Sequence, residues 1–334
     1  HYDYVINEYV ISGTADGEAY KTRLVIRQPA DDSRFSGLVV AEAMHPAGYA
    51  HAFQHNSVYL MASGHITVEV TTQGIDPIAA FNSARYGDHH VGNNQVSEIL
   101  AQAGALIKSD QSPIADLNLR KMILWGTSAS SRILTNYLPS HKVYKTADMQ
   151  NIYDGFMPTS NGSAIEPVDV PMIQLPTQHE FRNIATAKQD SDEPGSQFRV
   201  YEFVGIGHLM ARNNPRLTPN ECIHPITIYP SEAYMSTALH HLLEWVDKGI
   251  SPPRADRVLI DRNTDNDGSL MVLDEHGNPA GGIRNPYVDV PVAKYTAQNA
   301  VTATTKPGSE ILCRLSVWET PFSTAKLKDL YGSK

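Results

Sequence analysis

The sequence is short of positive charge, of long apolar runs and of cysteine, and each shortage excludes a class of protein. Lys and Arg number 27 against 36 Asp and Glu, which gives a formal net charge of -9. No cluster of basic residues offers a surface for phosphates, so no nucleic-acid partner is expected. No stretch of 18 apolar residues occurs, so neither a membrane-spanning helix nor a membrane partner is expected.

Cys222 and Cys313 are the only cysteines in the chain. They permit one disulfide or two separate thiols, and the sequence does not choose between these states. A disulfide would place the protein in a secreted or periplasmic compartment, whereas two thiols would fit the cytoplasm. The oligomeric state is equally open from the sequence.

The composition that remains is that of a globular enzyme, with 41% hydrophobic and 19% charged residues in 334. We expect one domain over 1–334, with insertions near 72–95 and 209–231. A tail rich in hairpins is expected over 252–334, because turn-forming sequences such as DEHGN and GG recur there.

Short apolar runs alternate with helical patterns along the chain, which predicts an α/β fold. Strand, helix and strand in succession form a parallel crossover unit, so we expect a mostly parallel central sheet with helices on both faces. Two strands near the N-terminus flank a turn rich in Gly and Asp and predict an antiparallel edge. The expected strands are 8–12, 22–27, 37–43, 65–71 and 121–125, and the best marked helices are 96–107 and 232–248.

The motif with the clearest chemistry is GTSAS at 126–130, which lies between the strand 121–125 and a helical stretch. A strand, a sharp turn and a helix form the context of a nucleophile elbow, where helix N–H groups favour developing negative charge. Ser128 is therefore the predicted nucleophile. Ser130 stands where G-x-S-x-G has its second glycine, and a serine-rich turn that caps a helix is the alternative interpretation.

A serine hydroxyl needs a base to remove its proton, and in this context the chain order is Ser, acid, His. His208 is the predicted base, because it follows the apolar run FRVYEFV in the turn GIGH. Weaker candidates are His224, in a proline-rich loop, and His240 and His241, within a predicted helix.

The acid must hold the imidazole in one tautomer and balance its positive charge. Glu180 is the predicted acid, because it lies five residues after the run PMIQL and 28 residues before His208. Asp154 is kept in reserve, and Asp169 and Asp190 are weaker candidates.

An oxyanion needs two N–H donors in this chemistry. We expect one from Ala129 and one from the loop after 37–43, where Met44 and His45 are nearest. His45 is an equally good candidate for a pocket wall that contacts substrate.

The pocket walls are expected from 72–90 and 209–231, because both segments mix large apolar and polar side chains. Besides His45, the substrate contacts predicted there are Tyr86, Leu209 and Met210. A medium-sized, partly apolar small molecule would fit such walls.

No cofactor and no metal are expected. Oxygen-bearing residues do match the spacing of a calcium loop, but their flanks read as strands, so a polar hairpin turn explains them more simply. These residues are Asn263, Asp265, Asp267, Gly268 and Asp274.

The chain resembles, over nearly its whole length, a largely uncharacterised alpha/beta hydrolase domain family of the alpha/beta-hydrolase superfamily. The resemblance is carried by GTSASSRILTNY at the elbow and, most specifically, by LDEHGNPAGGIRNPYVDVPVAKY near the end. Family members usually have G-E-S-Q-S at the elbow, so Ser130 agrees with the family while Thr127 and Ala129 depart from it. The family's G-T-A-H matches GIGH and implies that His208 is catalytic. Its T-E-T-D-L segment puts Glu180 on the aspartate and Gln178 on the glutamate.

The expected function is a serine hydrolase that cleaves a carboxylic ester or lactone through a Ser-His-Glu triad and an acyl-enzyme. An acyltransferase or a C–C bond hydrolase with the same triad is the alternative among enzymes. A non-catalytic ligand-binding member of the fold is the alternative outside them.

Overall fold

The computed structural model describes residues 2–181, 189–209, 222–261, 271–297, 299–302, 305 and 310–332. The strands are β1 (Tyr4–Ala15), β2 (Glu18–Pro29), β3 (Leu38–Ala43), β4 (Ile66–Val70), β5 (Lys121–Thr127), β6 (Gly155–Thr159), β7 (Met172–Gln174), β8 (Phe198–Val200), β9 (Ala293–Thr296) and β10 (Trp318–Pro321). The helices are α1 (His51–Ala62), α2 (Ile75–Phe81), α3 (Ser83–Tyr86), α4 (Val96–Ile107), α5 (Ala129–His141), α7 (Ser231–Lys248), α8 (Pro286–Asp289), α9 (Glu310–Arg314) and α10 (Thr324–Tyr331).

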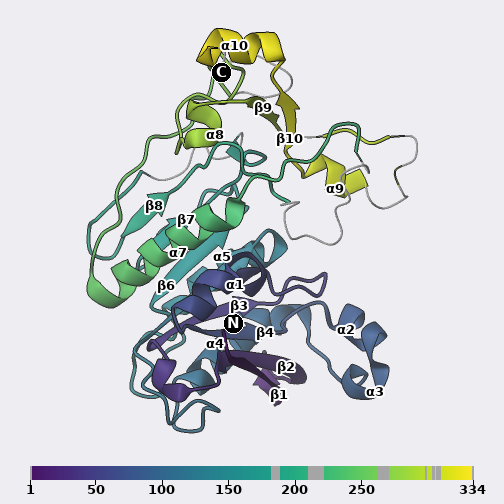
Figure 1. Ribbon diagram of the computed structural model, residues 1–334. Coiled ribbons are helices and arrows are strands. Elements are labelled where there is room, and N and C mark those ends of the chain that lie inside the picture. Colours follow the sequence, from purple (N-terminus) through teal and green to yellow (C-terminus); the bar gives the residue numbers. More distant parts are fainter. Residues whose placement is uncertain are drawn as a thin grey trace.

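Eight strands form one sheet in the order β1-β2-β4-β3-β5-β6-β7-β8 (Figure 1). The hairpin β1-β2 pairs antiparallel, and β2 pairs antiparallel with β4. Every other neighbouring pair in this sheet is parallel. The predicted fold class is confirmed, including the antiparallel N-terminal edge. Both strands of this hairpin are longer than predicted, because their pairing continues through polar residues up to the turn at Asp16 and Gly17.

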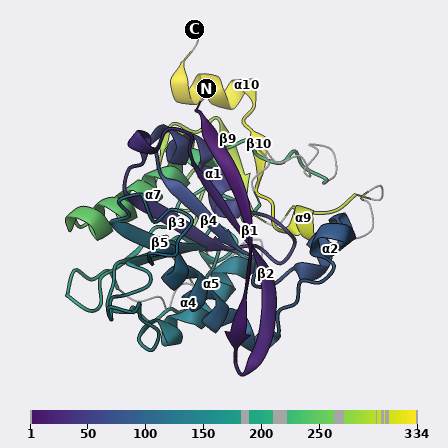
Figure 2. The same cartoon turned by 90° about the horizontal axis from the view of Figure 1, so that it is seen from below.

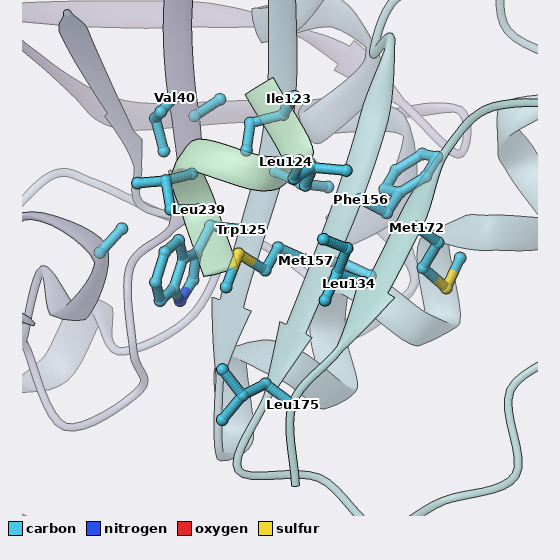
Figure 3. Packing of buried hydrophobic residues seen from close by; sticks show 14 of the residues in the cluster. Val40, Ile123, Leu124, Trp125, Leu134, Phe156, Met157, Met172, Leu175 and Leu239 are labelled. Atoms are coloured by element: carbon cyan, nitrogen blue, oxygen red, sulfur yellow. The ribbon is translucent and has the colours of Figure 1, made fainter. Parts of the chain in front are cut away.

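Helices cover both faces of the sheet, as Figure 2 shows with α1 and α7 on one side and α4 and α5 on the other. Strands covered on both faces need mostly apolar residues, which is why β3, β4 and β5 appear in the sequence as short runs rich in apolar residues. Glu42 in β3 and Glu69 in β4 are buried exceptions. The apolar side chains of these strands form one buried cluster with residues of β6, α5 and α7 (Figure 3). Trp125 is fully buried at its centre.

The C-terminal part contributes a two-stranded antiparallel sheet of β9 and β10 together with α8, α9 and α10 (Figure 1). A disulfide joins Cys222 to Cys313 in α9. The two sulfurs lie in a small cluster with Ile226, against which Leu209 and Leu312 pack. Among the described residues, no helix has both the length and the apolar character to cross a membrane.

Candidate active site

Ser128 lies between β5 and α5 in a strained backbone conformation, with φ of 58° and ψ of -119°. A positive φ in a residue with a Cβ costs of order 1–3 kcal/mol and persists only where the surroundings enforce it. One such restraint is the Ser128 N–H, which donates to Thr159 O at 3.0 Å. Gly126 is required as well, because a Cβ there would lie 2.5 Å from Ser130 O.

Ser130 supplies a second restraint and explains the departure from G-x-S-x-G. Its fully buried hydroxyl accepts from the Thr127 N–H at 2.9 Å and donates to Thr127 O at 2.8 Å. The side chain therefore closes the turn around Ser128 with two hydrogen bonds that a glycine cannot make.

The structure brings Ser128, His208 and Glu180 together in one line of hydrogen bonds. His208 Nε2 lies 2.7 Å from Ser128 Oγ, and His208 Nδ1 lies 2.5 Å from Glu180 Oε1. The His208 and Glu180 side chains are only 11% and 13% exposed. A hydroxyl, an imidazole and a carboxylate in this order form the arrangement that activates a serine.

The Glu180 carboxylate is held in its charged form. Burial raises the pKa of this group, but the hydrogen bonds from His208 and Thr177 outweigh burial and leave the pKa below its usual value. Glu180 Oε2 accepts from the Thr177 N–H at 2.7 Å and from Thr177 Oγ1 at 2.5 Å. Oε1 is therefore the oxygen that faces the imidazole.

His179 restrains the loop that carries His208, a role that the sequence did not reveal. Its Nδ1 accepts from the main-chain N–H of His208 at 3.2 Å, and the ring also hydrogen-bonds the backbone of Arg314. Burial lowers the pKa of His179 to about 4, although the nearby Glu180 opposes this shift. The ring is therefore neutral near pH 7, and its Nδ1 can accept.

The alternative acid, Asp154, lies at the opposite end of the sheet. Its Oδ2 accepts from Lys108 Nζ at 2.7 Å and from the Met122 N–H at 2.8 Å. Met122 is six residues before Ser128 along β5, which corresponds to roughly 20 Å in an extended strand. Asp154 therefore has no access to the imidazole of His208.

The weaker candidates for the base lie elsewhere. His224 stacks on Trp318 with ring centroids 3.8 Å apart, and the His240 Nδ1 lies 3.1 Å from the Tyr59 hydroxyl. His241 also belongs to α7, on the helix layer over the sheet.

A cavity of about 410 Å³ opens above Ser128. Its described lining includes the predicted contacts His45 and Leu209, which flank Ser128 and His208. The further lining residues come from the segment after β3, the end of β5 and the C-terminal part: Ala47, Tyr49, His51, Gln54, His55, Thr127, Ile311, Leu312 and Leu315.

The predicted contact Tyr86 and the predicted wall 72–90 are wrong, and the predicted contact Met210 lies outside the described residues. Tyr86 is absent from the described lining, because its hydroxyl donates to Glu8 on β1, with Oε2 at 2.9 Å. No described residue of 72–90 lines the cavity. Gly74 in this segment packs on the loop after β3, where a Cβ on Gly74 would lie 2.5 Å from Pro46 O. Met210 falls outside the described residues.

The amides predicted for the oxyanion hole differ in availability. Ala129 is the first residue of α5, where main-chain N–H groups have no partner within the helix. The prediction for Met44 is wrong in this structure, because its N–H donates to Val70 O at 2.8 Å and extends the β3-β4 pairing. The His45 N–H donates to Tyr49 O at 2.9 Å.

Among the described residues, no group of three His, Cys, Asp or Glu side chains has the arrangement of a metal site. Of the residues with calcium-loop spacing, only Asp274 is described. Its Oδ1 accepts from the N–H groups of His276 and Asn278, and its Oδ2 pairs with Arg284. Asp274 therefore stabilises a turn.

Comparison with known proteins identifies the family of the chain. The model of the family described as alpha/beta hydrolase domain matches residues 1–334. The chain belongs to this family. The resemblance inferred from the sequence is thus confirmed.

No curated protein matches the chain. Solved structures that resemble this alpha/beta hydrolase include a fungal esterase from Rhizomucor miehei, at 10% identity and a TM-score of 0.42, with 71% of this chain and 84% of that chain covered. Another is a lipase/esterase from Lactobacillus plantarum, at 12% identity and a TM-score of 0.36, with 51% of this chain and 79% of that chain covered.

Proposed function

We propose that this alpha/beta hydrolase is a carboxylic ester hydrolase, an esterase or lactonase, with Ser128, His208 and Glu180 as its triad. The observation that carries the proposal is the 2.7 Å contact between Ser128 Oγ and His208 Nε2, backed by Glu180 on the other imidazole nitrogen. The contact lies at a cavity of about 410 Å³, within the usual size range of small-molecule sites.

In the proposed mechanism, His208 Nε2 takes the Ser128 proton as the hydroxyl oxygen attacks the ester carbonyl carbon. Glu180 stabilises the imidazolium, and the Ala129 N–H stabilises the tetrahedral oxyanion. The His45 N–H acts as the second donor only after it exchanges Tyr49 O for the oxyanion. The imidazolium then protonates the leaving alcohol, and water, deprotonated by His208, releases the acid from the acyl-enzyme.

The decisive test replaces Ser128 by Ala, with Ser163→Ala as the control at an exposed serine outside the described lining of the cavity. Turnover of a panel of 4-nitrophenyl esters and lactones should fall by roughly 10⁶-fold in the first variant and stay unchanged in the second. A fluorophosphonate should label Ser128 in the unmodified protein. If Ser128→Ala turns the esters over at the original rate, with its circular dichroism spectrum unchanged, the mechanism is refuted.

We infer in addition that the protein works in an oxidising compartment, secreted or periplasmic. The support is the disulfide between Cys222 and Cys313, because such bonds persist where thiols are not kept reduced. Thiol titration of the natively produced protein under denaturing conditions tests this: no free thiol is expected, and two free thiols would contradict it.

A further inference from the structure

Three consecutive residues, 178–180, hold the loop that carries the proposed base. His179 and Glu180 contact His208 itself, one at its main-chain N–H and the other at its ring. The Gln178 N–H donates to Ile206 O at 3.0 Å, two residues before the base. Every residue of this short segment therefore makes a hydrogen bond to the loop.

The Gln178 side chain makes a second hydrogen bond to the loop. Its Oε1 accepts from the Gly205 N–H at 3.0 Å, and its Nε2 donates to Tyr295 O on β9 at 3.2 Å. An N–H group only donates and a carbonyl oxygen only accepts, so these two partners fix the orientation of the amide. The side chain is only 3% exposed, so water has little access to replace either partner. Gln178 thus joins the loop of the base to β9.

The loop 205–208 has few steric restraints of its own. Gly205 has a φ of 90°, in the region that favours glycine, and Gly207 is a second glycine directly before His208. A Cβ on Gly207 would lie 2.9 Å from Leu209 O, so the turn requires this glycine as well. The direction of the imidazole ring therefore depends on hydrogen bonds from outside the loop.

A C-terminal motif holds the residues that lead into this loop. The Ile283 N–H donates to Glu202 O at 2.7 Å, and Asn285 Nδ2 donates to Val204 O at 3.4 Å. Both donors belong to the motif LDEHGNPAGGIRNPYVDVPVAKY, whose last tyrosine is the partner of Gln178 Nε2. The motif therefore lies against the segment before the base, and Gln178 links it to the loop itself.

We propose that Gln178 is a positioning residue for the proposed base: its amide holds the loop against β9 and so keeps His208 Nε2 directed at Ser128 Oγ. Gln178 is absent from the described lining of the cavity, so it acts through the loop and not on the substrate. This inference rests on the proposed function, ester cleavage at Ser128. It predicts a loss in kcat with little change in KM.

Gln178→Met keeps the length of the side chain and removes both of its hydrogen bonds. We expect kcat for a 4-nitrophenyl ester to fall by roughly 10- to 100-fold, the scale of a small misplacement of a catalytic group. KM should change by less than about 3-fold. The rate at which a fluorophosphonate labels Ser128 should fall together with kcat, because labelling needs the same base.

Gln95→Met is the matched control. Gln95 is also buried, and its amide likewise accepts from a glycine, the Gly92 N–H at 2.6 Å, and donates to a main-chain oxygen, Glu18 O at 2.9 Å. It lies beside the β1-β2 hairpin, at the opposite edge of the sheet from β8. Its loss should lower Tm but leave kcat within about 3-fold.

Gln178→Glu gives a readout that a loss of packing alone does not give. The introduced carboxyl serves both partners only while it is protonated, since a carboxylate cannot donate to Tyr295 O. Burial raises the pKa of such a carboxyl, as do the carboxylates of Glu180, two residues along, and of Glu319, opposite Tyr295 on β10, whereas an imidazolium at His208 lowers it. The ratio of kcat in this variant to kcat in the original chain should therefore be near one at low pH and fall as the pH rises.

The possible outcomes distinguish the two proposals. An unchanged kcat in Gln178→Met, a loss that appears in KM instead, or an equal loss of kcat in Gln95→Met overturns the inference. A ratio that does not change with pH in Gln178→Glu also overturns it, and this result decides if Gln178→Met does not fold. In each case the proposed function stands while a fluorophosphonate still labels Ser128. Absence of both labelling and ester turnover in the original chain overturns the proposed function itself, and this inference with it.

Discussion

The substitution Glu180→Gln tests the proposed triad most sharply, because the structure fixes how the new amide must lie. The oxygen facing Thr177 accepts from two donors, the Thr177 N–H and Oγ1. Only the carbonyl oxygen of the glutamine amide can occupy that position. The NH₂ group then points at His208 Nδ1, where Oε1 lies 2.5 Å away in the present chain.

An NH₂ group at this position forces His208 Nδ1 to act as acceptor, which leaves the proton on Nε2. The imidazole can then no longer remove the proton from Ser128 Oγ. Loss of the correct tautomer and of the charge that balances the imidazolium costs roughly 10⁴-fold in kcat in enzymes of this type. We expect a loss of that size in kcat with a small change in KM, because Glu180 is absent from the described lining of the cavity.

Steady-state hydrolysis of a 4-nitrophenyl ester at pH 7 measures the effect. Glu275→Gln is the control, since the Glu275 side chain is 86% exposed. The carboxylate also affects stability. Its pKa in the folded chain lies below the ordinary 4.5, so its contribution is present above that value and is lost as the pH falls through the folded pKa. The difference in Tm between the two chains should therefore narrow in acid. A kcat of Glu180→Gln within 10-fold of the original would refute the role of Glu180.

Three other perturbations have distinct expected results. His179→Phe removes the acceptor of the His208 N–H and should lower kcat by roughly 5- to 100-fold, the scale of one unsatisfied N–H. His179→Asn should recover part of this loss. An unchanged kcat in His179→Phe would contradict the restraint of His208 by His179. Asp154→Asn should leave kcat within about 3-fold of the original value. It should lower the free energy of unfolding, measured in urea, by about 1–3 kcal/mol, because Lys108 loses its charged partner. A kcat loss as large as that of Glu180→Gln would return Asp154 to the triad. The double substitution Cys222→Ser and Cys313→Ser removes the disulfide, which joins residues 91 apart in the sequence. It should lower the free energy of unfolding by about 4–5 kcal/mol on a chain-entropy estimate. An unchanged Tm would show that the bond does not restrain the unfolded chain.

The strands and the elbow could be predicted from the sequence because their signals are local. β5 is buried on both faces, so Met122 to Trp125 had to be apolar, and the glycine at 126 marks the turn that follows. The order of Ser128, Glu180 and His208 in the chain then selected the partners. The structure brings these three residues together because β5, β6, β7 and β8 lie side by side in this order and all pair in parallel. The alternation of strands and helices already implied such a parallel sheet.

The cavity walls could not be predicted, because they depend on contacts between distant segments. Tyr86 is a residue type that often lines pockets, yet its hydroxyl donates to Glu8 on β1. No pattern in the sequence indicates this hydrogen bond. The amide of Met44 is used because the pairing of β3 with β4 continues one residue past the predicted strand end. Ile311, Leu312 and Leu315 lie within a segment predicted as a tail, and nothing local indicates that they line the cavity at Ser128.

The C-terminal part lines the cavity with Ile311, Leu312 and Leu315. It also restrains the loop that carries the proposed base, His208, through several contacts. The Leu209 N–H, one residue after His208, donates to Leu315 O at 2.9 Å, and His179 joins the His208 N–H to the backbone of Arg314. The disulfide at Cys313 lies on the same helix. Arg314 is the last residue of α9, and Leu315, which follows it, also lines the cavity. A shift of α9 is therefore expected to displace the imidazole of His208 as well as the substrate. Substitutions on α9 are therefore expected to alter kcat together with KM.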